Sequence, residues 1–198
     1  MKEADKPIFL NREISWLHFN NRVLQESANP QVPLIERLKF LGIFSSNMDE
    51  FFRVRVATLL RMSEMNMKLI AIKEKPEAIL KKISKMTAST QSEMEENLRQ
   101  IIDELKKEKI FLVNEKELTK AQIEFVKNYY DKQLEDAITP IMLSGDRSFP
   151  EMRDAKIYLF VRLRKENNPP EKKYALIEIP GSEYSRFLEL PDVDGNKY

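Results

Sequence analysis

Glycine is scarce in this chain, and its distribution constrains the fold more than any other feature of the sequence. Of the four glycines, Gly145, Gly181 and Gly195 lie in the last third of the chain, which leaves only Gly42 in the first 140 residues. Glycine is the residue that most readily adopts tight turns and ends helices. A long stretch with so few turn residues therefore predicts helices joined by short connections.

The spacing of apolar residues predicts three helical segments in this first part. The first runs from about Ser15 to Ala28, where Asn29-Pro30 ends it, and Pro33 begins the second. Pro76 suits the first turn of a third helix that continues to about Glu108. Every third or fourth position of this long helix carries a residue that, with one exception, is apolar. This spacing is typical of the packing seam of an antiparallel bundle. The seam residues are Ile79, Ile83, Met86, Thr90, Met94, Leu98, Ile101 and Leu105.

The sequence pattern changes after Lys109. Residues 110–113 form a short β-like run, and the spacing from Thr119 to about Ala137 predicts another amphipathic helix. Residues 157–163 and 174–179 are rich in residues that favour strands, and a loop rich in asparagine and proline separates them. This arrangement predicts a β-hairpin.

The fold class that follows is mainly α, then α+β. We predict an N-terminal antiparallel helical bundle with a long third helix at residues 1–108, and an α+β domain that contains the hairpin at residues 109–198. A lone hairpin is marginal in water. We therefore expect the second domain to be truncated.

Composition excludes several classes of function. The 33 basic and 32 acidic residues cancel, so no net charge points to nucleic acid. The chain has no cysteine and a single histidine, His18, which leaves few ligands for a metal site. It shows neither a signal peptide nor an apolar run of the roughly 20 residues that cross a bilayer. We expect a soluble cytoplasmic protein without a metal site in this chain.

The segment Ser45-Ser46-Asn47 places polar residues within an otherwise apolar helical pattern. Such residues cap helix N-termini, and Glu50 stands three positions after Asn47, as in a capping box. We therefore expect one helix to end near Phe44 and another to begin near Asn47. The amide of Asn47 also offers a donor and an acceptor side by side, which matches the polar edge of adenine. From spacing alone, capping without any ligand contact remains the stronger interpretation of Asn47.

The other polar candidates form no complete active site. Asp49 and Glu50 fit the first turn of a helix, and only one of Arg53 and Arg55 can point where Asn47 points, because they are two residues apart. We interpret His18 as a half-buried structural residue. The phosphate-binding and dinucleotide-binding glycine patterns are absent from the sequence.

Two long motifs give the sequence a specific resemblance. The segments Asn11-Arg-Glu-Ile-Ser-Trp-Leu-His-Phe-Asn-Asn-Arg-Val-Leu-Gln-Glu26 and Pro33-Leu-Ile-Glu-Arg-Leu-Lys-Phe-Leu-Gly-Ile-Phe-Ser-Ser-Asn-Met-Asp-Glu-Phe-Phe-Arg-Val-Arg55 closely resemble the N-terminal domain of the long bacterial polyphosphate kinases. The segment from Thr139 to Leu143 and the turn from Ile179 to Gly181 resemble the start of the family's second, or head, domain.

The resemblance implies a function for the parent protein and a role for one residue. The family transfers the terminal phosphate of ATP reversibly to inorganic polyphosphate through a phosphohistidine, with Mg²⁺ as a cofactor. Its catalytic histidines and magnesium ligands lie in later domains, so we expect no catalytic residue and no metal ligand in this chain. The asparagine of the Ser-Asn-Met-Asp-Glu motif, Asn47 here, lies at the ATP adenine in the family.

The resemblance also implies partners. They are ATP or ADP, polyphosphate and a second copy of the protein, in a dimer or a larger homo-oligomer, without nucleic acid. The location it implies is the cytoplasm, and peripheral association with the inner membrane stays open.

The alternative function is a helical interaction or dimerisation module that binds no ligand of its own. Its long seam, from Pro76 to Glu108, would pack on a partner.

Overall fold

The computed structural model describes two compact units of the chain. They comprise Met1–Lys109 and Ile110–Tyr198. The described residues are 10–64, 75–143, 148–164, 172–181 and 183–198.

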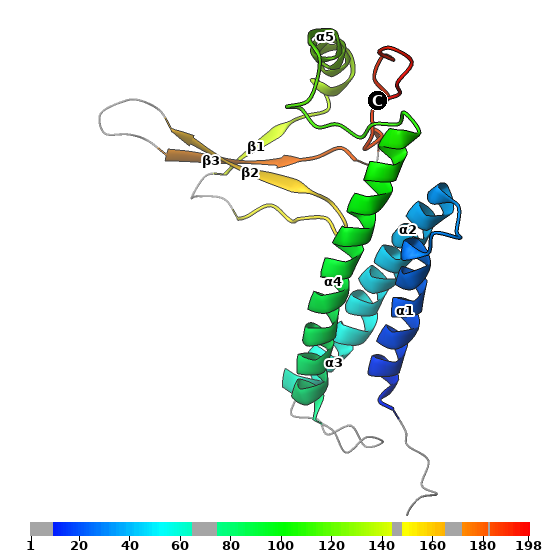
Figure 1. The fold of residues 1–198 in the computed structure, drawn as a ribbon. Coiled ribbons are helices and arrows are strands. Elements are labelled where there is room, and N and C mark those ends of the chain that lie inside the picture. The colour runs from blue at the N-terminus through cyan, green and yellow to red at the C-terminus, as the bar shows by residue number, and fades with distance from the viewer. Residues whose placement is uncertain (1–9, 65–74, 144–147, 165–171, 182) are drawn as a thin grey trace, which may run out of the picture. The chain divides into compact units, whose positions relative to one another are not determined.

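The first unit is an antiparallel helical bundle. The helix α1 begins after Asn11, whose side-chain oxygen accepts hydrogen bonds from the backbone N–H groups of Glu13 and Ile14. The chain then returns in the opposite direction through α2, a π-helical turn η2 and α3, and α4 runs back alongside them (Figure 1). Both the bundle and its long helix from Pro76 confirm the prediction. The bounds are Arg12–Ala28 for α1, Leu34–Phe51 for α2, Phe52–Val56 for η2, Ala57–Glu64 for α3 and Pro76–Lys107 for α4.

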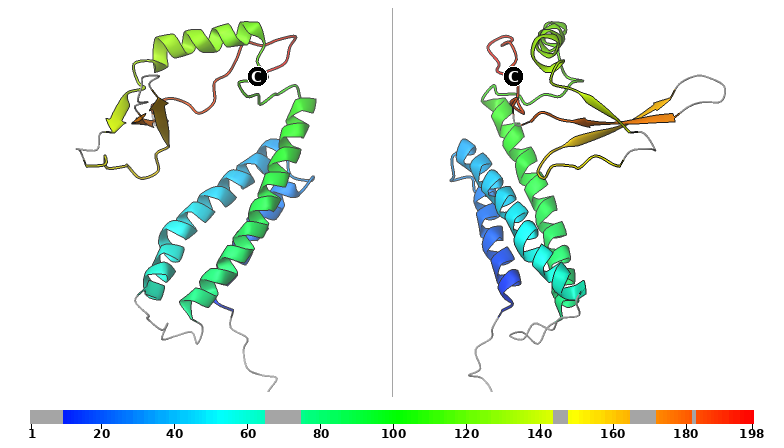
Figure 2. Two further views of the ribbon diagram at one scale, coloured as in Figure 1. Left: turned by 90° about the vertical axis from the view of Figure 1, so that its left-hand side faces the viewer. Right: turned by 180° about the vertical axis from the view of Figure 1, so that it is seen from behind.

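Two apolar clusters form the core of the bundle. Each draws on α4 and on the helices that pack against it, and the right-hand view of Figure 2 shows α1, α2 and α4 side by side. The seam of α4 therefore packs inside the bundle, which counts against the alternative in which this seam packs on a partner. The first cluster contains Leu17, Phe51, Val56, Leu59, Ile79 and Ile83, and the second contains Leu24, Leu41, Phe44 and Ile101.

Buried polar groups join the helices beside the second cluster. Arg37 on α2 is 4% exposed, donates to the carbonyl of Ser27 at 2.8 Å, and contacts both carboxylate oxygens of Glu104 on α4. Asn97 on α4 donates to the hydroxyl of Ser27 at 2.9 Å. Because a buried polar group without a partner is costly, these bonds favour one alignment of α1, α2 and α4 over others.

The predicted helix break between Phe44 and Asn47 is wrong. The helix α2 continues without interruption to Phe51, so Asn47 lies in its interior. Leu41, Phe44, Met48 and Phe51 recur at intervals of three and four, and all four pack in the two core clusters. Their burial outweighs the low helix propensity of serine and asparagine, each of which costs the helix only about 0.5 kcal/mol relative to alanine.

The second unit begins with a short helix. Thr119 and Gln122 form a capping box at the start of α5 (Lys120–Tyr129), which continues into a π-helical turn, η3 (Tyr130–Leu134). The helix predicted from Thr119 is thus present, with its last part wound as a π-helix. The β-like run at residues 110–113 is not a strand; only Ile110 forms an isolated bridge, with Lys197.

A three-stranded antiparallel sheet completes the second unit. Its strands are β1 (Pro140–Leu143), β2 (Tyr158–Arg164) and β3 (Lys172–Glu178), in the order β1-β3-β2 (Figure 1). The predicted hairpin is confirmed as β2 and β3, whose pairing runs from Tyr158 opposite Glu178 to Arg164 opposite Lys172. The edge strand β1 was not predicted, and it gives the hairpin the third strand that such sheets need for stability.

A charged cluster lies at one end of the β2–β3 pair, where Tyr158 at the start of β2 is opposite Glu178 at the end of β3. The carboxylate of Glu178 accepts hydrogen bonds from the guanidinium of Arg153 at 2.6 and 3.2 Å and from the hydroxyl of Tyr158 at 3.1 Å. Arg153 is the largest cause that holds the pKa of Glu178 below its ordinary value of 4.5, and Tyr158 adds to the effect.

This cluster leads to a prediction about acid. Because the pKa of Glu178 is lower in the folded chain, its contribution to stability is complete above pH 4.5 and is lost as the pH falls through the folded-state pKa. A titration of the Glu178 carboxyl group by NMR should give a pKa below 4.5, and Arg153→Gln should move it back toward that value. A pKa that does not respond to Arg153→Gln would contradict the assignment.

Candidate functional site

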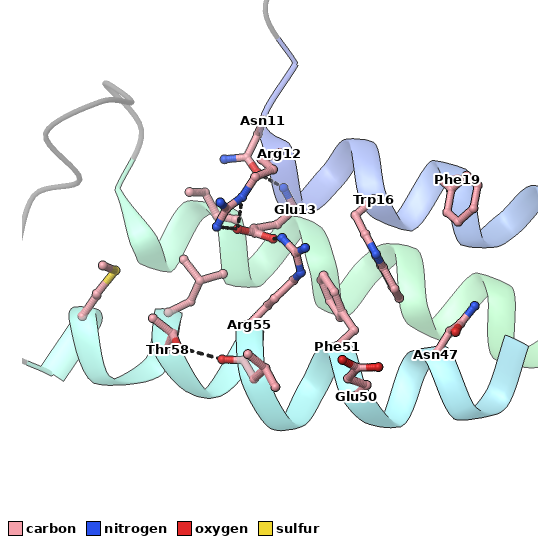
Figure 3. A pocket seen from close by; sticks show the side chains of 14 residues that line it. Asn11, Arg12, Glu13, Trp16, Phe19, Asn47, Glu50, Phe51, Arg55 and Thr58 are labelled. Atoms are coloured by element: carbon pink, nitrogen blue, oxygen red, sulfur yellow. Dashed lines mark hydrogen bonds and ion pairs between the residues drawn. The ribbon is translucent and has the colours of Figure 1, made fainter. Parts of the chain in front are cut away.

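A pocket of about 760 Å³ lies in the first unit beside Asn47. One wall is α1 and the other is the continuous rod of α2, η2 and α3 (Figure 3). Apolar and polar side chains share its lining. The apolar members are Trp16, Phe19, Phe51, Val54, Leu59, Met62 and Ile79, and the polar members are Asn11, Arg12, Glu13, Asn47, Glu50, Arg55 and Thr58.

Asn47 reaches this pocket from the interior of α2 rather than from a helix start. Its Nδ2 atom donates a hydrogen bond of 2.9 Å to the side-chain oxygen of Asn20 on α1. Its Oδ1 atom accepts no hydrogen bond within the part of the chain that the structure describes. The capping interpretation of Asn47 is therefore wrong, because its amide forms no bond to the backbone of a first helical turn.

Aromatic rings form the apolar wall of the pocket. Trp16 stacks on Phe51, with ring centroids 4.6 Å apart and planes inclined by 9°. In Figure 3, Trp16 extends from α1 toward the helix that carries Phe51 and Asn47. Phe51 is buried, whereas Trp16 is partly exposed and lines the pocket. A partly exposed indole next to an amide is suited to the flat face of an organic ring.

Paired charges mark another part of the pocket. The carboxylate of Glu13 accepts from Arg12 at 3.0 Å and from Arg55 at 2.9 Å. With Glu50, the four charged residues of the lining sum to zero. The pocket therefore offers fixed hydrogen-bonding groups rather than a strong net charge.

The two arginines of the motif have different environments, as their spacing predicts. Arg55 lines the pocket with Asn47 and bonds to Glu13 across to α1. Arg53 instead forms an exposed ion pair with Asp49, one turn earlier on the same helix. The π-helical turn η2, which contains both residues, was not predicted; π-helical turns occur frequently at functional sites.

The other polar candidates lie around the pocket or outside it. Ser45, Ser46, Asp49 and Glu50 are exposed on α2, and of these Glu50 lines the pocket. His18 is exposed and not half-buried as predicted. It lines a separate cavity of about 180 Å³.

Sequence reasoning missed two members of the pocket, Glu13 and Trp16. Both lie on α1, whereas Asn47 and Arg55 lie on α2 and η2, so no local spacing joins the two groups. A partial signal was present, because Glu13 and Trp16 lie within the first of the two motifs that carry the family resemblance.

The described residues contain neither a metal-binding cluster nor a membrane-spanning helix. No group of three or more histidine, aspartate or glutamate side chains is arranged to hold a metal ion in the described ranges. Likewise, none of the helices in these ranges is long and apolar enough to span a bilayer.

A cleft lined by aromatic rings and a few fixed polar groups is typical of small-molecule sites in helical domains.

Comparison with known proteins identifies the family. Residues 9–113 match the family described as polyphosphate kinase N-terminal domain, and residues 121–198 match the polyphosphate kinase middle domain. The chain belongs to the polyphosphate kinase family.

Individual relatives give the extent of the similarity. The chain is 38% identical over 195 residues to the polyphosphate kinase of Vibrio cholerae, and 35% identical over 195 residues to that of Escherichia coli strain K12. It spans 98% and 95% of its own length in these comparisons but only 27% of either relative. The crystal structure of polyphosphate kinase from Porphyromonas gingivalis matches with a TM-score of 0.82 and 28% identity, over 98% of this chain and 28% of that one.

Proposed function

We propose that this chain is the N-terminal part of an enzyme that transfers the terminal phosphate of ATP reversibly to inorganic polyphosphate through a phosphohistidine. In this proposal the chain supplies the adenine-side wall of the nucleotide site. Support comes from its family and from relatives whose name is polyphosphate kinase. The observation that carries the adenine role is the amide of Asn47, which is anchored by Asn20 and keeps its oxygen available beside the pocket.

The groups around Asn47 suit a purine base. The Oδ1 atom can accept a hydrogen bond from the 6-amino group of adenine, and Trp16 provides an aromatic surface for the flat ring. Base contacts of this kind orient the nucleotide without taking part in the transfer itself. Phosphoryl transfer depends on in-line positioning and on charge stabilisation at the phosphates. We therefore assign the chemical step to other parts of the enzyme.

The polar character of the motif favours this function over a scaffolding role. The core of a dimer interface is depleted of charged residues, whereas Ser45, Ser46, Asp49 and Glu50 are polar or charged and Asn47 borders a pocket. The long seam of α4 is already used inside the bundle. Both observations support a ligand site in this domain.

The pocket does not fit a magnesium site. Mg²⁺ prefers carboxylate and water oxygens in an octahedral arrangement. Both carboxylate oxygens of Glu13 are already engaged by Arg12 and Arg55, which leaves Glu50 as the remaining carboxylate of the lining. We therefore assign the Mg²⁺ of the parent enzyme to residues outside this pocket.

We further propose the partners and location that accompany this function. The parent enzyme would bind ATP or ADP and polyphosphate in the cytoplasm, and it would act as a homo-oligomer. Exposed apolar side chains on the outer side of α2 and η2 support contact with another surface. They are Ile35, Leu38, Ile43 and Phe52.

The division of labour leads to a prediction for the chain taken alone. We expect the purified 198-residue chain to incorporate no radiolabelled γ-phosphate from ATP into acid-insoluble polyphosphate, because the phosphohistidine is assigned elsewhere. A polyphosphate kinase of full family length, assayed in parallel, is the positive control. Polymer synthesis by the chain alone, at a rate that depends on ATP, would refute the proposal that it carries only a wall of the site.

A further inference from the structure

The amide of Asn47 is held by a second amide that is entirely enclosed. Asn20 on α1 is 0% exposed. Its Nδ2 atom donates to the backbone carbonyl of Phe44 at 3.3 Å, and its Oδ1 atom accepts from the Nδ2 atom of Asn47 at 2.9 Å. The three groups form a chain of hydrogen bonds that begins at a fixed backbone atom and ends at the pocket.

This chain of bonds allows only one orientation of each amide. If the Asn20 amide were reversed, its oxygen would face the carbonyl oxygen of Phe44, and two acceptors would oppose each other without water. The carbonyl of Phe44 therefore fixes Asn20. By the same reasoning, the oxygen of Asn20 fixes Asn47 with Nδ2 inward and Oδ1 directed away from Asn20.

We propose that Asn20 is a positioning residue that sets the base preference of the site. This inference rests on the adenine role proposed above for Asn47. Asn20 holds the Asn47 amide so that its Oδ1 atom faces the base as an acceptor. The 6-amino group of adenine can donate to this atom. The 6-oxo group of guanine is itself an acceptor and would oppose it. A buried residue without ligand contact thus selects a 6-aminopurine over a 6-oxopurine.

The test compares ATP with GTP in a polyphosphate kinase of full family length that contains this sequence. Asn20→Leu keeps the number and branching of the side-chain heavy atoms and removes both hydrogen bonds, so the Asn47 amide can rotate. We expect KM for ATP to rise about three- to tenfold, the value of one neutral hydrogen bond, with kcat changed by less than about twofold. The ratio of kcat/KM for ATP to kcat/KM for GTP should fall by a similar factor.

Asn97→Leu is the matched control. Asn97 is also a buried asparagine of the same bundle, 5% exposed, and its amide bonds across helices to the hydroxyl of Ser27 at 2.9 Å. Its replacement should lower stability to a similar extent but leave the ATP-to-GTP ratio unchanged. An equal loss of the ratio in both variants would overturn the positioning role.

A conservative variant separates orientation from packing. The protonated side chain of Asn20→Asp can donate to the carbonyl of Phe44 and accept from Asn47, so this variant should retain the ATP-to-GTP ratio. If Asn20→Leu does not fold, Asn20→Ser, which is too short to hold both partners, carries the same expected loss. Retention of the ratio in Asn20→Leu or Asn20→Ser would refute the inference.

Asn47→Ala makes this inference and the proposed function separately refutable. If Asn47→Ala raises KM for ATP while the Asn20 variants leave the ratio intact, only the positioning role of Asn20 fails. If Asn47→Ala leaves the dependence on ATP unchanged, the adenine role itself fails, whatever the Asn20 variants do.

Discussion

Replacement of Phe51 by alanine should lower the free energy of unfolding of the bundle by about 3–5 kcal/mol, the usual cost of removing a fully buried phenylalanine. Phe51 is 1% exposed, belongs to the first core cluster and stacks on Trp16 at 4.6 Å. Its loss would leave a cavity beneath the pocket. Urea denaturation followed by the fluorescence of Trp16, the only tryptophan of the chain, measures this change.

The next residue provides a matched control. Phe52 is 43% exposed and is the first residue of η2. Phe52→Ala should change the free energy of unfolding by less than about 1 kcal/mol, because a half-exposed side chain loses little on truncation. If both variants lost the same free energy of unfolding, the assignment of Phe51 to the core and of Phe52 to the surface would be wrong.

Asn47→Ala should raise KM for ATP about three- to tenfold in a polyphosphate kinase of full family length, with a smaller change in kcat. A contact to the base is made equally in the bound substrate and in the transition state, and loss of such uniform binding raises KM without slowing the chemical step. Steady-state rates of polyphosphate synthesis over a range of ATP concentrations provide both constants. An unchanged dependence on ATP would contradict the contact.

Two controls protect the interpretation of Asn47→Ala. The variant leaves the buried oxygen of Asn20 without its donor, which should lower the free energy of unfolding by about 1–3 kcal/mol, so folding must be checked at the assay temperature. Ser46→Ala changes the exposed neighbouring residue on α2 and should leave KM for ATP unchanged.

The bundle could be predicted from the sequence because its helices depend on local, periodic patterns. The α4 helix starts at Pro76 and keeps its apolar seam to its last turns, and the hairpin of β2 and β3 follows alternating strand-forming residues. Such patterns need no knowledge of distant contacts. The short edge strand β1 has only four residues, too few for a periodic pattern to identify it.

The site was predicted only in part, for a different physical reason. The polar residues from Ser45 to Asn47 favour a helix start locally, yet the core packing of Phe44 and Phe51 keeps α2 continuous. The pocket itself depends on contacts between helices, such as Glu13 with Arg55 and Asn20 with Asn47. These pairs are separated by 42 and 27 residues along the chain, so spacing cannot identify them.

The most direct test of the adenine contact removes each partner of the proposed hydrogen bond in turn. ATP and purine riboside triphosphate, which lacks the 6-amino group, are compared in a polyphosphate kinase of full family length with Asn47 and with Asn47→Ala. Loss of the amino group should raise KM about three- to tenfold when Asn47 is present and should have little effect in Asn47→Ala. The same ratio of KM values in both enzymes would contradict a contact between Asn47 and adenine.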